Sequence, residues 1–133
     1  MKEFLNNWVW LDLLFYKDEF QEINKLYLVH PLDRKKFKSN TLYECIGSEG
    51  DYIILKKKTH TYRVQKEAVK QIMPNPKFNW NDKVIQISRP NIEASIDDFF
   101  WHHKNQKYFY HLTVNGKKKS NRYDETDLMK IEI

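Results

Sequence analysis

Two carboxylates and two histidines in the second half of the chain are the side chains with the chemistry of a metal site. Asp97 and Asp98 offer oxygen ligands, and His102 and His103 offer ring nitrogens, of the kinds that zinc binds. Neighbouring residues of a strand point to opposite faces, so at most one of each pair can approach a single ion unless the strand is bulged. No further histidine or carboxylate group has the spacing of an established metal motif. The sequence therefore predicts no metal and no other cofactor.

Nucleophilic catalysis by a thiol would depend on the one cysteine, Cys45. It lies in an apolar stretch that predicts a strand, where a thiol usually behaves as a small hydrophobic group. His30 and His60 become partners of this thiol only if the tertiary fold brings them together. The chain has only three glycines, none of them in a phosphate-binding loop, and it has no nucleophile elbow. We therefore expect a protein that is not an enzyme.

Aromatic side chains are stronger candidates for a binding site. Rings can stack on a nucleobase, hold a cation or dock a proline-rich strand. The candidates for such a groove are Trp101, Tyr108, Tyr110 and Tyr123. Tyr108 and Tyr110 share a face by alternation, so both lie in the groove or both lie in the core. A small β unit needs rings inside it, which favours the core, and exposure of the pair would be the functional alternative.

Basic residues form three clusters in the sequence. They are Arg34-Lys35-Lys36 with Lys38, Lys56-Lys57-Lys58, and Lys117-Lys118-Lys119 with Arg122. The second and third clusters fall in corresponding hairpins of the two predicted halves of the chain. Lysines at hairpin ends and edge strands prevent unwanted pairing between sheets, which needs no ligand. On a nucleic acid the same lysines would meet phosphates and give a salt-dependent affinity, and both interpretations remain open.

A predicted antiparallel hairpin must position the third basic cluster. Residues 108–113 alternate between two faces, which is the period-two pattern of a strand. Asn115-Gly116 follows, a dipeptide that tolerates the positive φ angles of a type I′ turn. This strongest local signal of the chain predicts a small antiparallel β module.

The N-terminal segment shows a different period. Apolar side chains recur there every three to four residues, at Phe4, Leu5, Trp8, Leu11 and Phe15. This spacing predicts a helix over residues 2–17. Further apolar residues widen the stripe, so a helix buried on two sides and a segment that is partly a strand both remain open. Trp8 and Trp10 are expected to pack against a β unit, with an exposed contact surface as the alternative.

Two prolines divide the chain. Pro74-Asn75-Pro76 can continue neither a helix nor a strand ladder, and a similar order of patterns runs on both sides of it. Residues 83–87, for example, correspond to residues 25–29, and both predict a short strand. Internal similarity of this kind indicates two related units of five strands. The predicted organisation is a helical segment at 1–19, β units at 20–73 and 78–133, and a linker at 74–77.

Each predicted unit resembles an SH3-like or Tudor-like barrel in its order of elements: a strand, a long polar loop, three meandering strands, one helical turn and a short last strand. The second unit is similar to small bacterial proteins of this fold through Trp101-His-His-Lys, Tyr108-Phe-Tyr, Val114-Asn-Gly-Lys-Lys-Lys-Ser and Arg122-Tyr-Asp-Glu-Thr-Asp-Leu. The resemblance implies a mainly β chain of two five-stranded SH3-like barrels in tandem with an N-terminal helix. It also implies an immunity or regulatory protein, although this scaffold serves many functions.

The composition is that of a folded, basic protein. The 133 residues are 41% hydrophobic and 15% aromatic, enough for a core, and the formal net charge of +5 favours anionic partners. One cysteine excludes an internal disulfide and fits a reducing cytoplasm. Asn6, Asn7 and Asp12 interrupt the N-terminal apolar run, so we expect neither a signal peptide nor a membrane span, and no membrane partner.

Two functions of different classes agree with these patterns. The first is a non-catalytic protein-binding module, acting as an inhibitor, immunity factor or adaptor, with an acidic protein as its expected partner. Trp80 and Trp101 would be its anchors, ringed by Lys and Asp. The alternative is a nucleic-acid-binding protein in which tyrosine rings stack on bases while phosphates meet Lys117, Lys118, Lys119 and Arg122. The sequence leaves the oligomeric state open.

Overall fold

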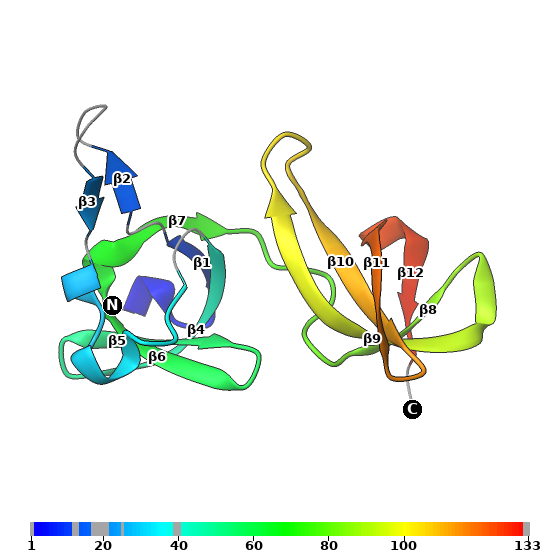
Figure 1. The fold of residues 1–133 in the computed structure, drawn as a ribbon, viewed down its shortest axis with the longest axis horizontal. Coiled ribbons are helices and arrows are strands. Elements are labelled where there is room, and N and C mark those ends of the chain that lie inside the picture. Colours follow the sequence, from blue (N-terminus) through cyan, green and yellow to red (C-terminus); the bar gives the residue numbers. More distant parts are fainter. Residues whose placement is uncertain (1, 12–13, 17–21, 25, 39–40, 132–133) are drawn as a thin grey trace. The chain divides into compact units, whose positions relative to one another are not determined.

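The computed structural model describes residues 2–11, 14–16, 22–24, 26–38 and 41–131 (Figure 1). The chain divides into two compact units, Met1–Asn75 and Pro76–Ile133, and each contains one five-stranded antiparallel sheet. The boundary falls between Asn75 and Pro76, in a segment without regular structure. Prolines on both sides of Asn75 remove the backbone donors that a strand would need there. No helix of the described residues has the length and apolar character that crossing a bilayer requires.

The first unit is a sheet with a small additional hairpin. Its strands are β1 (Trp8–Leu11), β2 (Leu14–Tyr16), β3 (Glu22–Asn24), β4 (Thr41–Glu49), β5 (Tyr52–Lys57), β6 (His60–Gln65) and β7 (Val69–Met73). The 3-10 helix η1 (Lys2–Phe4) precedes β1, and three more, η2 (Leu26–Leu28), η3 (Pro31–Asp33) and η4 (Lys66–Ala68), connect later strands. The main sheet has the order β6-β5-β4-β1-β7, and β2 pairs only with β3 among the described strands (Figure 1).

The second unit repeats the topology of this main sheet. Its elements are β8 (Lys83–Gln86), β9 (Arg89–His102), β10 (Lys107–Val114), β11 (Lys117–Asp124), η5 (Glu125–Asp127) and β12 (Leu128–Lys130). The strand order is β11-β10-β9-β8-β12 (Figure 1). When the strands of each sheet are counted along the chain, both sheets have the order fourth, third, second, first, fifth. The chain is therefore mainly β with one five-stranded antiparallel sheet in each unit, as predicted, although the first unit also contains the hairpin β2-β3.

The prediction of an N-terminal helix is wrong. Residues Trp8–Leu11 form β1, which pairs with β4 on one side and with β7 on the other, and only the 3-10 turn η1 precedes it. A central strand covered on both faces is apolar at consecutive positions, and such a run also fits a buried helix. Trp8, Val9 and Leu11 are buried, so the extra apolar residues that widened the predicted stripe reflect a two-sided strand. Part of the predicted segment, residues 12–13 and 17, lies outside the described residues.

The predicted first strand of the first unit, at residues 25–29, is also wrong. Residues 25–29 were expected to be a strand, but Leu26–Leu28 form η2 and Val29 makes a single antiparallel bridge to Val64. Lys25 lies outside the described residues. The position next to β4 is already occupied by β1, so this segment can only cover the edge of the sheet at β6.

The prediction of closed SH3-like barrels is wrong as well. A barrel requires hydrogen bonds between the two edge strands of its sheet. These edges are β6 and β7 in the first unit and β11 and β12 in the second, and the described pairings join neither pair. In each unit a 3-10 turn, η4 or η5, carries the chain from one edge to the other without closing the ladder. Both sheets therefore remain open.

Each unit has its own core, and the predicted hairpin forms in the second. Val9, Tyr43, Ile53, Leu55 and Val64 are fully buried members of the first core. The second core contains Phe78, Val84, Ile96, Tyr110 and Leu112. Between β10 and β11, Asn115 and Gly116 have φ angles of 51° and 76°, so the positive-φ turn predicted for this dipeptide is confirmed.

Candidate functional site

One face of the second sheet carries both rings and cations. Side chains alternate along β10, so Lys107, Phe109 and His111 lie on the face opposite the buried Tyr108 and Tyr110. Their cross-strand partners lie on the same face and come from β9 and β11. We call this surface the aromatic-basic face, and its members are Phe100, His102, Lys107, Phe109, His111 and Arg122.

Phe109 is the centre of the aromatic-basic face. The Arg122 guanidinium carbon lies 4.4 Å from the Phe109 ring centroid, and Lys107 Nζ lies 5.3 Å from it. The rings of Phe100 and His102 lie 6.0 Å and 5.3 Å away, measured between centroids. These neighbours leave Phe109 only 8% exposed, so it holds cations in place and offers no free ring face.

The two cations over Phe109 differ in their partners. Lys107 Nζ donates to Asp124 Oδ2, and this hydrogen bond lowers the pKa of the Asp124 carboxyl from its ordinary value. Asp124 also caps η5, because its Oδ1 accepts from Thr126 N at 3.3 Å. Arg122 forms no ion pair with any described carboxylate. Its donors are therefore available to an outside acceptor, while Lys107 is held within the unit.

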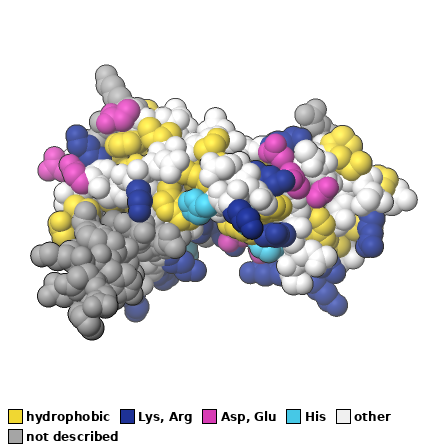
Figure 2. All heavy atoms as spheres, turned by 90° about the horizontal axis from the view of Figure 1, so that it is seen from above, with side chains coloured by type: hydrophobic (Ala, Val, Ile, Leu, Met, Phe, Trp, Pro, Cys, Tyr) yellow, Lys and Arg dark blue, Asp and Glu magenta, His cyan; other side chains and the backbone are white. Residues whose placement is uncertain are grey.

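Three lysines extend this basic surface along β11. Lys117 and Lys119 are exposed, and Lys118 Nζ lies 3.9 Å from Asp97 Oδ1. The pairing of β10 with β11 shifts between Thr113–Lys118 and His111–Arg122, so β11 is bulged along an edge that is already rich in lysine. A bulge and lysines both discourage edge-to-edge pairing, which fits the edge-protection interpretation of this cluster. Lys and Arg side chains also lie beside hydrophobic ones on the face of the molecule drawn in Figure 2.

Three of the predicted binding rings belong to the core. Tyr110 is fully buried, and its Oη accepts from Lys77 N at 3.0 Å and from Phe78 N at 3.4 Å. Burial raises the pKa of Tyr110 to about 12, and it also raises the pKa of Tyr108. The Trp80 ring lies 5.0 Å from the Phe99 ring, and its Nε1 donates to Asp98 Oδ1 at 3.2 Å. These residues join the segment before β8 to the sheet, and none of them presents a free surface.

The other two predicted rings are half-buried. Trp101 packs edge-on against Tyr108, with ring centroids 4.9 Å apart, on the face opposite Phe109. Tyr123 Oη accepts from Gln86 Nε2 at 3.4 Å. Tyr123 and Arg122 also line an open cleft of about 710 Å³ bounded by the turn after β8 and by η5. The structure thus brings Arg122 and Tyr123 together, but it separates both from Trp101.

The residues considered for metal binding and catalysis have other contacts. Asp98 Oδ1 accepts from Phe99 N at 2.9 Å, and His102 Nδ1 accepts from Asn105 N at 3.1 Å. Within the described ranges, no three His, Cys, Asp or Glu side chains lie close enough together to hold a metal ion. Cys45 is buried, and burial raises the pKa of its thiol. A protonated, enclosed thiol is a poor nucleophile.

Sequence reasoning missed the aromatic-basic face, to which Phe100, the buried Phe109 and His111 belong. The strand alternation from Lys107 to Val114 contains the necessary signal, because it places Phe109 on the same face as Lys107 and His111. The sequence also lacks any direct sign that Arg122 lies over Phe109, since that contact depends on the strand register.

Comparison with known proteins identifies a family. The model of DUF6960, a family of unknown function, matches residues 17–129. The match spans most of both units, and the chain belongs to this family. No curated protein and no solved structure matches the chain.

Proposed function

We propose that this DUF6960 protein is a non-catalytic protein-binding protein, of the inhibitor, immunity or adaptor type, and that its second unit binds an acidic partner. The observation that carries the proposal is the surface formed by the aromatic-basic face and β11. Between Lys117 and Arg122 the chain has four cations and no carboxylate, and only Lys118 has a described carboxylate within 4 Å. The proposal places the protein in the reducing cytoplasm, where the single thiol of Cys45 stays free.

The arrangement of Arg122 supports a protein interface. A guanidinium held 4.4 Å above a ring loses less conformational freedom on binding than a free side chain does. Arginine and aromatic residues are also the groups that contribute most binding energy at protein interfaces. Phe100 is half-buried beside Phe109, so it supplies apolar area next to the cations. Together these residues form an apolar centre with a basic rim.

Nucleic-acid binding is the second candidate function, and the exposed lysines of β11 favour it. Phosphates could bind Lys117, Lys119 and Arg122 without any new arrangement of the strand. The aromatic rings give less support to nucleic-acid binding, because stacking on bases needs a free ring face. Tyr108 and Tyr110 are buried, and Phe109 is covered by cations. The geometry therefore favours a protein partner over a single-stranded nucleic acid.

Charge reversal on β11 tests the proposal. The variant Lys117→Glu with Lys119→Glu is compared with Lys83→Glu with Lys104→Glu, which makes the same change in net charge at exposed positions of the same unit. Tagged full-length chains are used for affinity purification from nuclease-treated lysate of the native host. We expect an acidic protein that is retained by the wild type and the control pair and lost from the β11 pair.

Three results would count against this assignment. Equal retention of the same partner by all three chains would show that β11 does not contact it. Retention of the partner from untreated lysate but not from nuclease-treated lysate, together with salt-sensitive binding to a polynucleotide that requires Lys117 and Lys119, would favour the nucleic-acid function. A defined partner that is not acidic would contradict the electrostatic argument.

A further inference from the structure

A groove of about 200 Å³ lies at the surface of the first unit, far along the chain from the aromatic-basic face. Its walls come from η3, the turn after η3 and the start of β6. The lining residues that matter here are Leu32, Asp33, Lys35, Lys36, His60 and Thr61. The groove thus combines an aliphatic side chain, a hydroxyl and two lysine ammonium groups in one small space.

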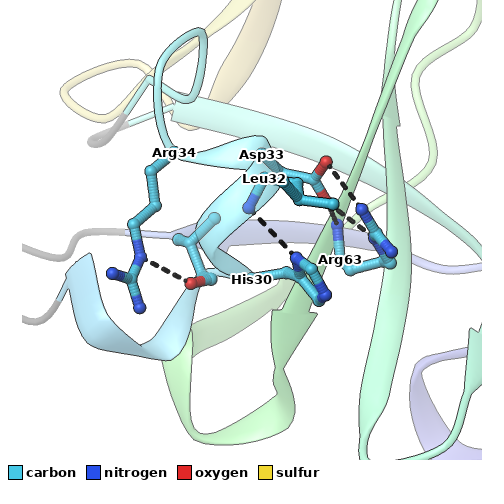
Figure 3. A network of polar contacts seen from close by, with 6 residues as sticks. His30, Leu32, Asp33, Arg34 and Arg63 are labelled. Carbon is cyan, nitrogen blue, oxygen red and sulfur yellow. Dashed lines mark hydrogen bonds and ion pairs between the residues drawn. The ribbon is translucent and has the colours of Figure 1, made fainter.

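One wall of this groove is held in place by its own hydrogen bonds. Leu32 N donates to His30 Nδ1 at 3.1 Å, and Arg34 Nε donates to the Val29 carbonyl at 2.8 Å (Figure 3). Pro31 begins η3 and fixes its first φ angle. The backbone around Leu32 is therefore set before any ligand arrives, which lowers the entropic cost of binding.

Asp33, the only carboxylate among the described residues that line the groove, is already bound. Asp33 Oδ2 accepts from Arg63 N at 2.7 Å and from Arg63 Nε at 2.9 Å, and Oδ1 accepts from Arg63 Nη2 at 3.2 Å (Figure 3). These bonds hold the pKa of Asp33 below its ordinary value. The carboxylate consequently neutralises Arg63 and not the lysines beside it.

The cations of the groove lack such partners. Neither Lys35 nor Lys36 forms an ion pair with any described residue, and both are exposed together with His60. Both nearby arginines are committed to protein acceptors, Arg63 to Asp33 and Arg34 to the carbonyls of Val29 and Tyr27. The groove therefore offers ammonium groups and a hydroxyl to an anion, without the bidentate guanidinium that favours phosphate.

An exposed apolar side chain lies beside these cations. Leu32 is 79% exposed although its backbone is fixed by η3, and Tyr27 is 63% exposed where its carbonyl meets Arg34. A phosphate backbone makes no apolar contact with an exposed leucine. A peptide with an apolar residue next to a carboxylate would contact both the leucine side chain and the lysine ammonium groups. The combination of charge and aliphatic surface identifies the class of ligand.

We propose that this groove binds an acidic peptide segment of a protein partner, with a carboxylate at Lys35 and Lys36 and an adjacent apolar side chain on Leu32. The site lies wholly within the first unit. It gives the protein a peptide-binding contact that does not depend on the second-unit surface.

Amide chemical shifts of the full-length, isotope-labelled protein test this proposal. The probe is a capped pentapeptide with one leucine between two pairs of glutamates, and the reference is the same peptide with glutamines. We expect saturable shifts at the amides of Leu32, Lys36 and Thr61 with the acidic peptide. Lys35→Glu with Lys36→Glu should weaken this binding by about tenfold or more, because it places like charges together. The control pair Lys83→Glu with Lys104→Glu should stay within about twofold of the wild type.

The possible results separate the alternatives. Absence of shifts at these amides, or equal shifts with the glutamine peptide, would overturn the proposal. Tighter binding of an oligothymidine at the same amides would assign the groove to nucleic acid instead. A Leu32→Ser variant that binds as well as the wild type would remove the apolar part of the argument. The readout is confined to the first unit, so failure here is distinguishable from failure of the function proposed for β11.

Discussion

Removal of the Tyr110 hydroxyl should destabilise the second unit without affecting its binding surface. The hydroxyl oxygen accepts from two backbone donors, Lys77 N and Phe78 N, in the segment that leads into the second sheet. Tyr110→Phe keeps the buried ring and its edge contact with Phe78, whose ring centroid lies 5.3 Å away. The change therefore isolates the two hydrogen bonds from the packing of the ring.

The size of this effect follows from the environment of the two donors. Leaving a buried donor unsatisfied costs about 1 to 3 kcal/mol. The hydrogen bond from Phe78 N is buried, whereas the one from Lys77 N is only partly buried. We expect a loss of about 1 to 2 kcal/mol in the free energy of unfolding of the second unit. For a domain of this size each kcal/mol corresponds to roughly 4 to 8 °C in the unfolding midpoint.

Amide hydrogen exchange measures this loss at the donors themselves. Exchange at Phe78 should accelerate in Tyr110→Phe, and thermal unfolding followed by near-ultraviolet circular dichroism should show the lower midpoint. Tyr123→Phe is the matched control, because Tyr123 is half-buried and its hydroxyl accepts only from the Gln86 side chain, at 3.4 Å. Unchanged exchange at Phe78 together with a wild-type midpoint would contradict this prediction. So would a loss of partner binding at temperatures where the variant is folded.

Three further changes test other parts of the structure. Gly116→Ala should cost about 1 to 2 kcal/mol because φ is 76° there, whereas Gly47→Ala, where a methyl group would meet Ile54 at 3.8 Å, should be close to neutral in urea unfolding. Asp33→Asn should reduce the acid sensitivity of the first unit. The pKa of Asp33 in the folded protein is below its ordinary value of about 3.8. The carboxylate therefore stabilises the fold above that pH, and this stabilisation is lost as the pH falls through the folded pKa. Urea titrations at about pH 5 and about pH 2.5 measure the difference, and equal losses of stability in variant and wild type would contradict the prediction. Phe109→Leu should lower the ionic strength at which the protein elutes from heparin, because the ring that orients Arg122 is gone, and an unchanged elution position would show that Phe109 does not orient the guanidinium.

The exposed part of the candidate site could be predicted from the sequence. A run of lysines after an Asn-Gly turn must lie on a hairpin arm, and the structure leaves Lys117, Lys119 and Arg122 exposed. The rings were harder to place, because alternation assigns residues to two faces without stating which face is covered. Tyr108 and Tyr110 face the core, and the opposite face carries Phe109. Only the packing of the sheet against the segment at Phe78 and Trp80 decided between the two.

Features that depend on a few neighbouring residues can be predicted from the sequence alone. The turn at Asn115 and Gly116, the alternation along β10 and the interruption at Pro74 and Pro76 follow from backbone sterics and from missing donors. These constraints act locally, so the residues that impose them are adjacent in the chain.

Other features depend on which of several distant segments occupies a given position in the fold. Trp8–Leu11 is apolar enough for a buried helix or a central strand, and it is a strand because β4 and β7 satisfy its backbone on both sides. Because β1 occupies the position next to β4, residues 26–28 form η2 instead of a strand there. Whether each sheet closes depends on contact between edge strands far apart in the sequence, and β6 and β7, like β11 and β12, remain unpaired with each other. Hydrogen bonds of this kind are made between segments, so no single segment encodes them.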